Sequence, residues 1–303
     1  MKRLAILAAV ALSMLLSANL SAKQPSHIVF IGLDGWGAYS MPKADMPNVK
    51  ALMDRGAWTL KKRSVLPSSS AINWASIFMG VGTEGHGYTQ WGSQTPEIPS
   101  IALSENGIFP TIFTVVRMQK PDAVTGLIYE WPGIAYVTDT LSTSYHKNVP
   151  VGPDNDSSAI TAEAVRYIKE AKPLLFAMTY DNPDHVGHTA GHDTPEIYDI
   201  LAYLDGQIGR VIQATKDAGI YDDTVFIVSS DHGGIEKGHG GITLREMETP
   251  LIMAGPGIKD IGELQSAIMQ TDIAPTIATL LGLTYPQAWT GRPVTEALQP
   301  ATD

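Results

Sequence analysis

Three short apolar runs, each leading into acidic and histidine side chains, constrain the fold of this chain more than any other feature. The runs are HIVFIGL at 27–33, LLFAMTY at 174–180 and TVFIVSS at 224–230. Continuous apolar runs of this length, bounded by turn residues, are typical of strands that are buried on both faces of a sheet. The chain is therefore expected to contain a sheet that is covered on both sides.

Helical patterns separate these strand-like runs. Amphipathic segments follow Asp156 and Thr194, which are suitable capping residues, and Gly219 marks the end of the second segment. Such alternation predicts an α/β fold with a mostly parallel central sheet flanked by helices on both faces. Further strands are expected at 57–66, 123–129 and 250–255, and further helices between Asp45 and Gly56, at 71–79, at 112–119 and after Asp272.

The segment 131–157 is rich in Pro, Gly, Ser and Thr and has no clear periodicity. We expect an irregular surface excursion there, within a single catalytic domain that spans residues 23–303. A linker between two domains is the alternative, because long loops without structure are uncommon in compact domains.

The first residues have the layout of a secretory signal peptide. Lys2 and Arg3 precede an apolar run at 4–16 and then small residues, so we expect a signal peptide at 1–22 that is cut after Ala22. The run is shorter than the ~20 residues that span a bilayer, which disfavours a membrane anchor. No later segment is apolar enough to cross a membrane. We expect an exported protein, periplasmic or extracellular.

Charge and composition exclude several classes of partner and site. Removing residues 1–22, with Lys2 and Arg3, takes the formal net charge from −10 to −12. This balance argues against nucleic acid as a general partner, since phosphate neutralisation needs clustered basic residues. The chain has no Cys, which excludes disulfides and thiolate metal ligands. The sequence gives no basis for an oligomeric state.

The polar segments that follow the three runs supply the ligand types of a metal centre. In open α/β sheets, ligands gather outside the carboxyl ends of the strands, so these side chains are expected to converge. Three carboxylates and three imidazoles are enough to hold two divalent ions through oxygen and nitrogen. Taken singly, each motif could instead be a polar turn, a helix cap or a loop histidine. The candidate ligands are Asp34, Asp184, His188, Asp231, His232 and His239.

A run of serines in LPSSSAINW at 66–74 follows another expected strand. These serines could merely form a turn and cap a helix. Beside two metal ions, however, a hydroxyl nucleophile favours hydrolysis of a charged ester, and phosphate is the leading candidate.

In these motifs the sequence resembles the alkaline phosphatase superfamily, most closely the branch of phosphodiesterases, nucleotide pyrophosphatases and related bacterial phosphatases. The ordered motifs are LDG, a nucleophile segment that ends in Asn73 to Gly80, PDxxGH, and SDHGG followed by His239. The resemblance runs from about His27 to about Val294. It implies an alkaline phosphatase-like fold and two metal ions, usually zinc.

The resemblance also implies a role for each site residue. Asp34, Asp231 and His232 would hold one ion together with the oxygen of Ser70, and Asp184, His188 and His239 would hold the other. Ser70 would be the nucleophile, where the branch commonly has Thr, and would form a phosphoseryl intermediate with a small phosphorylated substrate. Asn73, with backbone N–H groups around residues 70–71, would bind the phosphate oxygens.

The choice among reactions stays open at this point. Phosphomonoester hydrolysis is slightly favoured, because the compact chain leaves little room for a large substrate domain, with Lys147 as one candidate for the extra charge. Phosphodiester or nucleotide pyrophosphate hydrolysis is the alternative, and Trp36, Trp74 and Trp131 could line its pocket or else pack in the core.

Three other functions are less favoured. A sulfatase would carry Pro and Arg soon after the nucleophile in a C/S-x-P-x-R pattern, and residues 71–74 read AINW. A phosphoethanolamine transferase would normally need a membrane anchor. A non-catalytic binding module would lack a ligand or the nucleophile, and none is missing.

Overall fold

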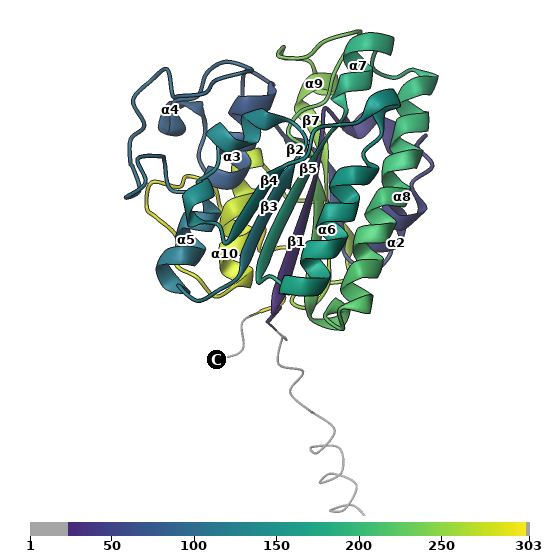
Figure 1. Cartoon of the computed structure of the whole chain (residues 1–303). Coiled ribbons are helices and arrows are strands. Elements are labelled where there is room, and N and C mark those ends of the chain that lie inside the picture. Colours follow the sequence, from purple (N-terminus) through teal and green to yellow (C-terminus); the bar gives the residue numbers. More distant parts are fainter. Residues whose placement is uncertain (1–23, 301–303) are drawn as a thin grey trace, which may run out of the picture.

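An eight-stranded sheet forms the centre of the molecule in the computed structural model, which describes residues 24–300 (Figure 1). The signal peptide expected at 1–22 lies outside the described residues. The strand order is β4-β3-β5-β1-β6-β7-β2-β8. The strands are β1 (His27–Asp34), β2 (Ala57–Arg63), β3 (Thr125–Tyr129), β4 (Tyr145–Asn148), β5 (Leu175–Pro183), β6 (Thr224–Ser229), β7 (Glu248–Ala254) and β8 (Gly262–Glu263).

The sheet is mostly parallel, as expected. Strand β1 lies between β5 and β6 and is parallel to both, whereas β7 is antiparallel to its neighbours β6 and β2. Helices α3, α5 and α10 cover one face and α2, α6 and α8 cover the other (Figure 1). The α/β fold class is therefore confirmed. The longer helices are α2 (Pro47–Met53), α3 (Ser70–Met79), α5 (Ile112–Gln119), α6 (Ser158–Ala171), α7 (Asp184–Ala190), α8 (Pro195–Asp217) and α10 (Ile273–Leu280).

The packing of strand β1 explains why its sequence is continuously apolar and does not alternate between apolar and polar residues. Ile28 and Phe30 pack into the core under α3, α5 and α10, while Val29 and Ile31 pack into the core under α2, α6 and α8. Successive side chains of a strand point to opposite faces, so a strand with a helical layer on each side needs apolar residues at every position.

Two helix starts differ slightly from the sequence expectation. Met46, not Asp45, is the N-cap of α2, and Ser157, not Asp156, precedes α6. Asp156 still serves the start of α6, because its Oδ1 accepts a hydrogen bond from Ser158 N at 2.9 Å. Thr194 and Asp272 occupy the N-cap positions of α8 and α10, as expected.

The segment 131–157 is more ordered than its composition indicates. It contains three 3-10 turns, Pro132–Tyr136, Thr140–Ser142 and Pro153–Asn155. It also contains β4, which pairs in parallel with β3 at the edge of the sheet. The expected irregular excursion thus supplies an edge strand, and the division of the chain into domains stays a prediction.

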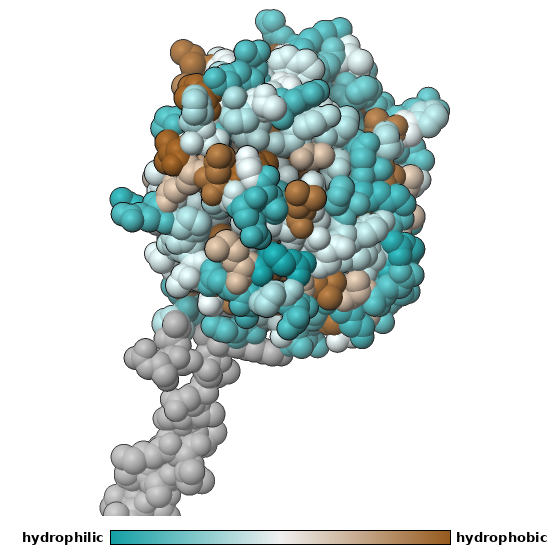
Figure 2. All heavy atoms as spheres, turned by 60° about the vertical axis from the view of Figure 1, so that its left-hand side comes forward, coloured by the Kyte–Doolittle hydropathy of each residue, from teal (hydrophilic) through white to brown (hydrophobic). Residues whose placement is uncertain are grey.

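The surface agrees with a fold that buries its apolar residues in two layers. On the face that Figure 2 turns forward, apolar residues stand singly or in small groups among hydrophilic ones. Within residues 24–300, no helix has both the length and the apolarity to cross a bilayer.

Candidate active site

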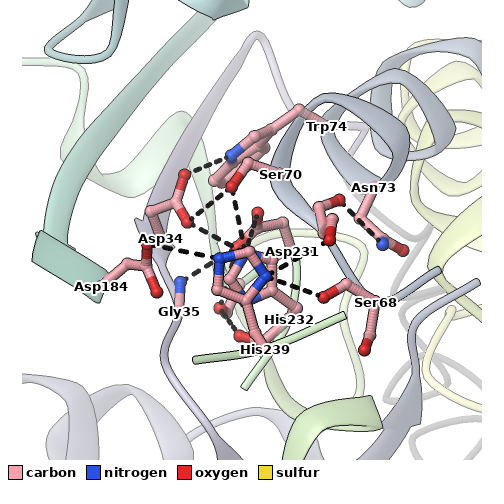
Figure 3. Close-up of polar contacts among 12 residues, drawn as sticks. Asp34, Gly35, Ser68, Ser70, Asn73, Trp74, Asp184, Asp231, His232 and His239 are labelled. Atoms are coloured by element: carbon pink, nitrogen blue, oxygen red, sulfur yellow. Dashed lines mark hydrogen bonds and ion pairs between the residues drawn. The ribbon is translucent and has the colours of Figure 1, made fainter. Parts of the chain in front are cut away.

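The predicted ligands meet at the carboxyl edge of the sheet. Asp34 ends β1, Asp184 begins α7 directly after β5, and Asp231 follows β6 by two residues. The parallel register fixes this convergence, since Asp34 pairs with Pro183 and Gly32 pairs with Ser229. Figure 3 shows the resulting cluster of carboxylates and imidazoles around the start of α3.

The first ligand group, defined as Asp34, Asp231 and His232, is buried. Its ligand atoms all lie within 4.8 Å of one another. His232 Nε2 is 3.3 Å from Asp34 Oδ1 and 3.3 Å from Asp231 Oδ2. Trp74 Nε1 donates to Asp34 Oδ2 at 2.8 Å, and Gly35 N donates to Asp231 Oδ1 at 3.1 Å. Each carboxylate therefore has one oxygen held by the protein and one turned toward His232.

The buried carboxylates of the first group indicate a site for a cation. Burial raises the pKa of Asp34 well above its ordinary value, and the charges of Asp231 and Asp184 add to the effect. Burial likewise raises the pKa of Asp231 to about 7. Asp231 Oδ2 is buried and has no hydrogen-bond partner among residues 24–300. Two adjacent buried carboxylates cannot both ionise without a positive partner, and a divalent ion would supply one.

The second ligand group, defined as Asp184, His188 and His239, is built on α7 and on the glycine-rich loop after β6. Asp184 Oδ2 lies 3.0 Å from His188 Nε2 and 3.8 Å from His239 Nε2. The ligand atoms of Asp184 and His239 also lie within 4.8 Å of His232, so His232 belongs to both potential metal sites. The rings of His232 and His239 stack with their centroids 3.9 Å apart.

The charges of the second group are already partly balanced. Burial acts to raise the pKa of Asp184, but the hydrogen bond from His188 and the charges of His232 and His239 hold it below its ordinary value. The hydrogen bond to Asp184 raises the pKa of His188 to about 9. Burial lowers the pKa of His239 to about 4. Without a metal ion, Asp184 and His188 form an ion pair at neutral pH, and His188 must release a proton to bind an ion.

All three candidate imidazole ligands are oriented in the same way. Nδ1 of His188 faces Lys237 O at 3.0 Å, Nδ1 of His232 faces Gly233 O at 2.8 Å, and Nδ1 of His239 faces Ser68 O at 3.2 Å. A carbonyl oxygen only accepts hydrogen bonds, so each Nδ1 carries the hydrogen. Each Nε2 is then turned toward the carboxylates with its lone pair available once the ring is neutral, which is the arrangement of a metal-bound histidine.

Ser70 is the serine that faces the first ligand group. It is the first residue of α3, and its Oγ lies 3.1 Å from His232 Nε2 and 3.5 Å from Asp34 Oδ1. Ser68 Oγ donates instead to Gly241 O, and Ser69 Oγ contacts His239 Nδ1 at 3.3 Å. Ser70 opens onto a pocket of about 170 Å³. Its lining residues are Ser70, Trp91, Trp131, Asp181, Asp184, His185, His188 and His239.

The structure does not bring Asn73 to this pocket. Its Nδ2 points at the carbonyl oxygens of Val65, Pro67 and Ser69, and its Oδ1 accepts a hydrogen bond from Val65 N. The loop before α3 turns back on the helix, and the Asn73 amide satisfies its backbone. The Asn73 amide is thus held by the backbone of this loop, and its contact with phosphate stays a prediction.

Three further expectations about the pocket differ from the structure. The N–H of Ala71 donates to Trp91 O at 3.1 Å and is not free for a phosphate oxygen. Trp36 and Trp74 are fully buried and pack in the core, so Trp131 is the one of the three expected tryptophans that lines the pocket. Lys147 pairs with Glu163 at 3.0 Å and does not line the pocket.

Some pocket residues carry no sequence signal. Trp91 reaches the pocket because the long loop after α4 (Thr83–His86) returns to the start of α3, and no periodicity predicts that path. Asp181 is an exception, because its position near the end of β5 is a sequence signal for a residue of the site. His185 and His192 lie beside the recognised motif, where sequence alone gives no means of separating ligands from neighbours.

Comparison with known proteins places the chain in a family. The sequence profile of type I phosphodiesterase / nucleotide pyrophosphatase matches residues 28–252. The 2,3-bisphosphoglycerate-independent phosphoglycerate mutase of Rhodopirellula baltica is 31% identical over 174 residues, which are 55% of this chain and 30% of that protein. Human ectonucleotide pyrophosphatase/phosphodiesterase family member 5 is 24% identical over 241 residues, which are 75% of this chain and 48% of that protein. The matches thus span less than half the length of these relatives.

A solved structure supports the fold. Murine ectonucleotide pyrophosphatase/phosphodiesterase 5, as an inactive variant in complex with AMP, has a TM-score of 0.72 to this chain at 17% identity. The match covers 90% of this chain and 100% of the murine chain. The expected alkaline phosphatase-like fold is therefore confirmed.

Proposed function

Since the chain belongs to the type I phosphodiesterase / nucleotide pyrophosphatase family of the alkaline phosphatase superfamily, we propose that it is a two-metal hydrolase of phosphoric esters. We propose small phosphodiesters or pyrophosphates as its substrates. The observation that carries this proposal is the position of Ser70 Oγ, 3.1 Å from the one imidazole that belongs to both potential metal sites.

Zinc is the metal that fits the side chains best. The first ion would be held by Asp34, Asp231 and His232 with Ser70 Oγ, and the second by Asp184, His188 and His239. Oxygen and nitrogen ligands with three imidazoles suit zinc better than calcium, which prefers oxygen alone. Bound zinc supplies Lewis-acid chemistry, which lowers the pKa of a hydroxyl and stabilises negative charge on phosphate oxygens.

The chain's own residues position the nucleophile. Asp34 and His232 fix the direction of Ser70 Oγ, which would give up its proton to solvent, attack phosphorus and form the Oγ–P bond. The P–O bond to the leaving group would break with its electron pair on the leaving oxygen, and water would then cleave the phosphoseryl intermediate. Ser70 begins α3, so the positive end of the helix dipole favours the phosphate there.

The pocket favours a diester over a monoester. A monoester dianion presents an additional negative charge that is usually met by Arg or Lys, and none of the described residues that line the pocket is either. A diester instead needs a surface for its second substituent, and Trp91 and Trp131 offer apolar area beside Ser70. These residues support diester or pyrophosphate hydrolysis over the monoester hydrolysis that chain length slightly favoured.

Export is a separate part of the proposal. It rests on the basic, apolar and small-residue pattern at 1–22, which is typical of a signal peptide that is removed. Expression of the full chain with N-terminal sequencing of the exported protein tests it. A mature N-terminus near residue 23 supports export, and an intact Met1 in the cell interior contradicts it.

One experiment tests the catalytic proposal directly. Bound metal is measured in the purified full chain, followed by turnover of bis-nitrophenyl phosphate, nitrophenyl phosphate and nitrophenyl sulfate. Ser70→Ala is expected to abolish turnover and retain metal, while Ser266→Ala, an exposed control, leaves both unchanged. Normal turnover by Ser70→Ala would contradict the proposed nucleophile. Faster turnover of the monoester than of the diester would contradict the substrate class.

A further inference from the structure

Two buried polar groups without hydrogen-bond partners face each other behind the second ligand group. The His192 side chain is 0% exposed, and neither of its ring nitrogens has a partner among the described residues. Asp184 Oδ1 is also buried and has no hydrogen-bond partner there. His192 Nε2 lies 3.8 Å from this oxygen. Burying unpaired polar atoms costs free energy, so the pair needs a functional or structural explanation.

The His192 ring is packed against backbone on both sides. A Cβ built on Gly187 would lie 2.5 Å from His192 Nε2, and a Cβ built on Gly234 would lie 2.2 Å from it. Gly187 belongs to α7, which carries Asp184 and His188, and Gly234 follows His232 in the turn after β6. The ring therefore joins the two segments that supply the second ligand group, and only residues without a side chain leave space for it.

The backbone on either side of the ring is fixed as well. His192 N donates to Glu236 O at 2.6 Å. Asp193 has a φ of +67°, and its carboxylate accepts from Lys43 at 2.8 Å and pairs with Arg245 at 3.0 Å. A residue other than glycine seldom adopts this conformation unless surrounding contacts hold it. These contacts keep the turn in place, and with it the direction of the His192 ring.

From this geometry we infer that His192 is a positioning residue for the second metal ion. Its Nε2–H is placed to donate to Asp184 Oδ1, which leaves Oδ2 to bind the ion together with His188 and His239. Oδ2 already faces these two imidazoles. The 3.8 Å separation is longer than a hydrogen bond of about 2.7–3.2 Å and closes with a small rotation of the carboxylate. This role rests on the proposed two-metal function.

Two variants separate positioning from packing. His192→Leu removes the donor and keeps an apolar side chain in the space, whereas His192→Gln keeps an amide N–H with a reach similar to that of Nε2–H. His146→Leu, at an exposed position of β4, is the control. The metal-stripped full chains are titrated with zinc against a competing chelator and with cobalt, whose visible spectrum reports the coordination of each ion. The Tm of each metal-free chain is measured in parallel.

We expect His192→Leu to bind the first ion normally and to weaken the second by about 10- to 100-fold, with an altered cobalt spectrum. His192→Gln should restore most of this affinity, and the metal-free Tm of both variants should not fall. Wild-type affinity for both ions in His192→Leu would overturn the inference. The inference would also be overturned if both variants lost the same affinity for the second ion and had a lower metal-free Tm, since a packing defect alone would then explain the loss. A wild-type chain that binds no ion would instead overturn the two-metal function.

Discussion

The two ligand groups differ in what holds them in place. Asp34, Asp231 and His232 come from the ends of two adjacent parallel strands, and each is at most 3% exposed. In the second group, His188 lies on the short helix α7 with its side chain 47% exposed, and His239 comes from a loop. Strand register fixes the first group, whereas the packing of a helix and a loop fixes the second.

The groups also differ in charge. In the first, burial raises the pKa of both carboxyls, so the metal-free group retains protons, because its surroundings do not compensate two negative charges. In the second, His188 supplies the compensating charge to Asp184. An ion that enters the first group displaces protons from these carboxyls, and one that enters the second displaces the proton of His188. Because strand register already holds the first group in place, that group should be occupied at lower metal concentration.

The largest effect is expected for Asp231→Asn. The variant should lose the first ion and at least about 10³-fold of turnover, because Asp231 would hold the ion that binds Ser70. The metal-free variant should nevertheless be more stable than the metal-free wild type at pH 8, since a buried negative charge has been removed. Metal analysis, turnover and thermal unfolding measure the three results. A less stable metal-free variant would contradict the proposed repulsion.

A selective loss is expected for His188→Ala. The second ion should bind at least about 100-fold more weakly, while the first should bind as in the wild type. Zinc competition titrations measure both affinities, and Asp45→Ala, at a position exposed to solvent, is the control. Equal weakening of both ions would show that the two groups form a single cooperative site and would remove the distinction drawn here.

The stability that the first ligand group and His188 contribute to the metal-free protein should fall as pH rises. A carboxyl whose pKa is raised in the folded state keeps its proton at pH values where the unfolded chain has released it. Its contribution to stability is therefore complete below about pH 4 and declines as pH rises to the folded pKa, which is about 7 for Asp231. The raised pKa of His188 acts in the same direction. Its contribution to stability is complete below about pH 6.5 and is lost as pH rises through the folded pKa of about 9.

Zinc provides the control for this pH dependence. An ion replaces the protons on the carboxylates, so the zinc-loaded protein should keep its Tm between pH 6 and 9, while the chelator-treated protein loses stability. Parallel thermal melts across this range measure both. Equal slopes with and without zinc would mean that zinc does not bind at these carboxylates.

The smallest effect is expected at the outer wall of the pocket. Trp91→Ala should raise KM for bis-nitrophenyl phosphate by about 3- to 10-fold through lost aromatic contact and leave kcat nearly unchanged. Trp289→Phe, in the core away from the pocket, serves as the control for loss of an indole. An unchanged KM would remove Trp91 from substrate binding and leave the metal ligands unaffected.

The difference between strand ends and loops also explains which features could be predicted from the sequence. The apolar runs located β1, β5 and β6, and the polar residues after them located Asp34, Asp184 and Asp231. The order of motifs singled out Ser70 among three adjacent serines, and the structure turns its Oγ toward the first group. These inferences depend on local pattern and on the rule that parallel strands end at one edge.

The remaining features depend on contacts between segments that are distant in sequence. The position of Trp91 depends on the return of a long loop to α3, and the burial of His192 depends on two glycines in separate segments. Asn73 matches a family pattern, yet the loop before it uses its amide for backbone hydrogen bonds. No periodicity in the chain encodes these choices, because each is settled by packing after the strands have formed.

Backbone carbonyl oxygens accept the hydrogen bonds from Nδ1–H of His188, His232 and His239, and this has a consequence for directed evolution. A main-chain oxygen is present whatever residue occupies its position, so changing the side chain of Lys237 or Ser68 does not in itself remove the contact. Libraries that randomise the rim of the pocket can therefore search for new substrates while the imidazoles keep their orientation.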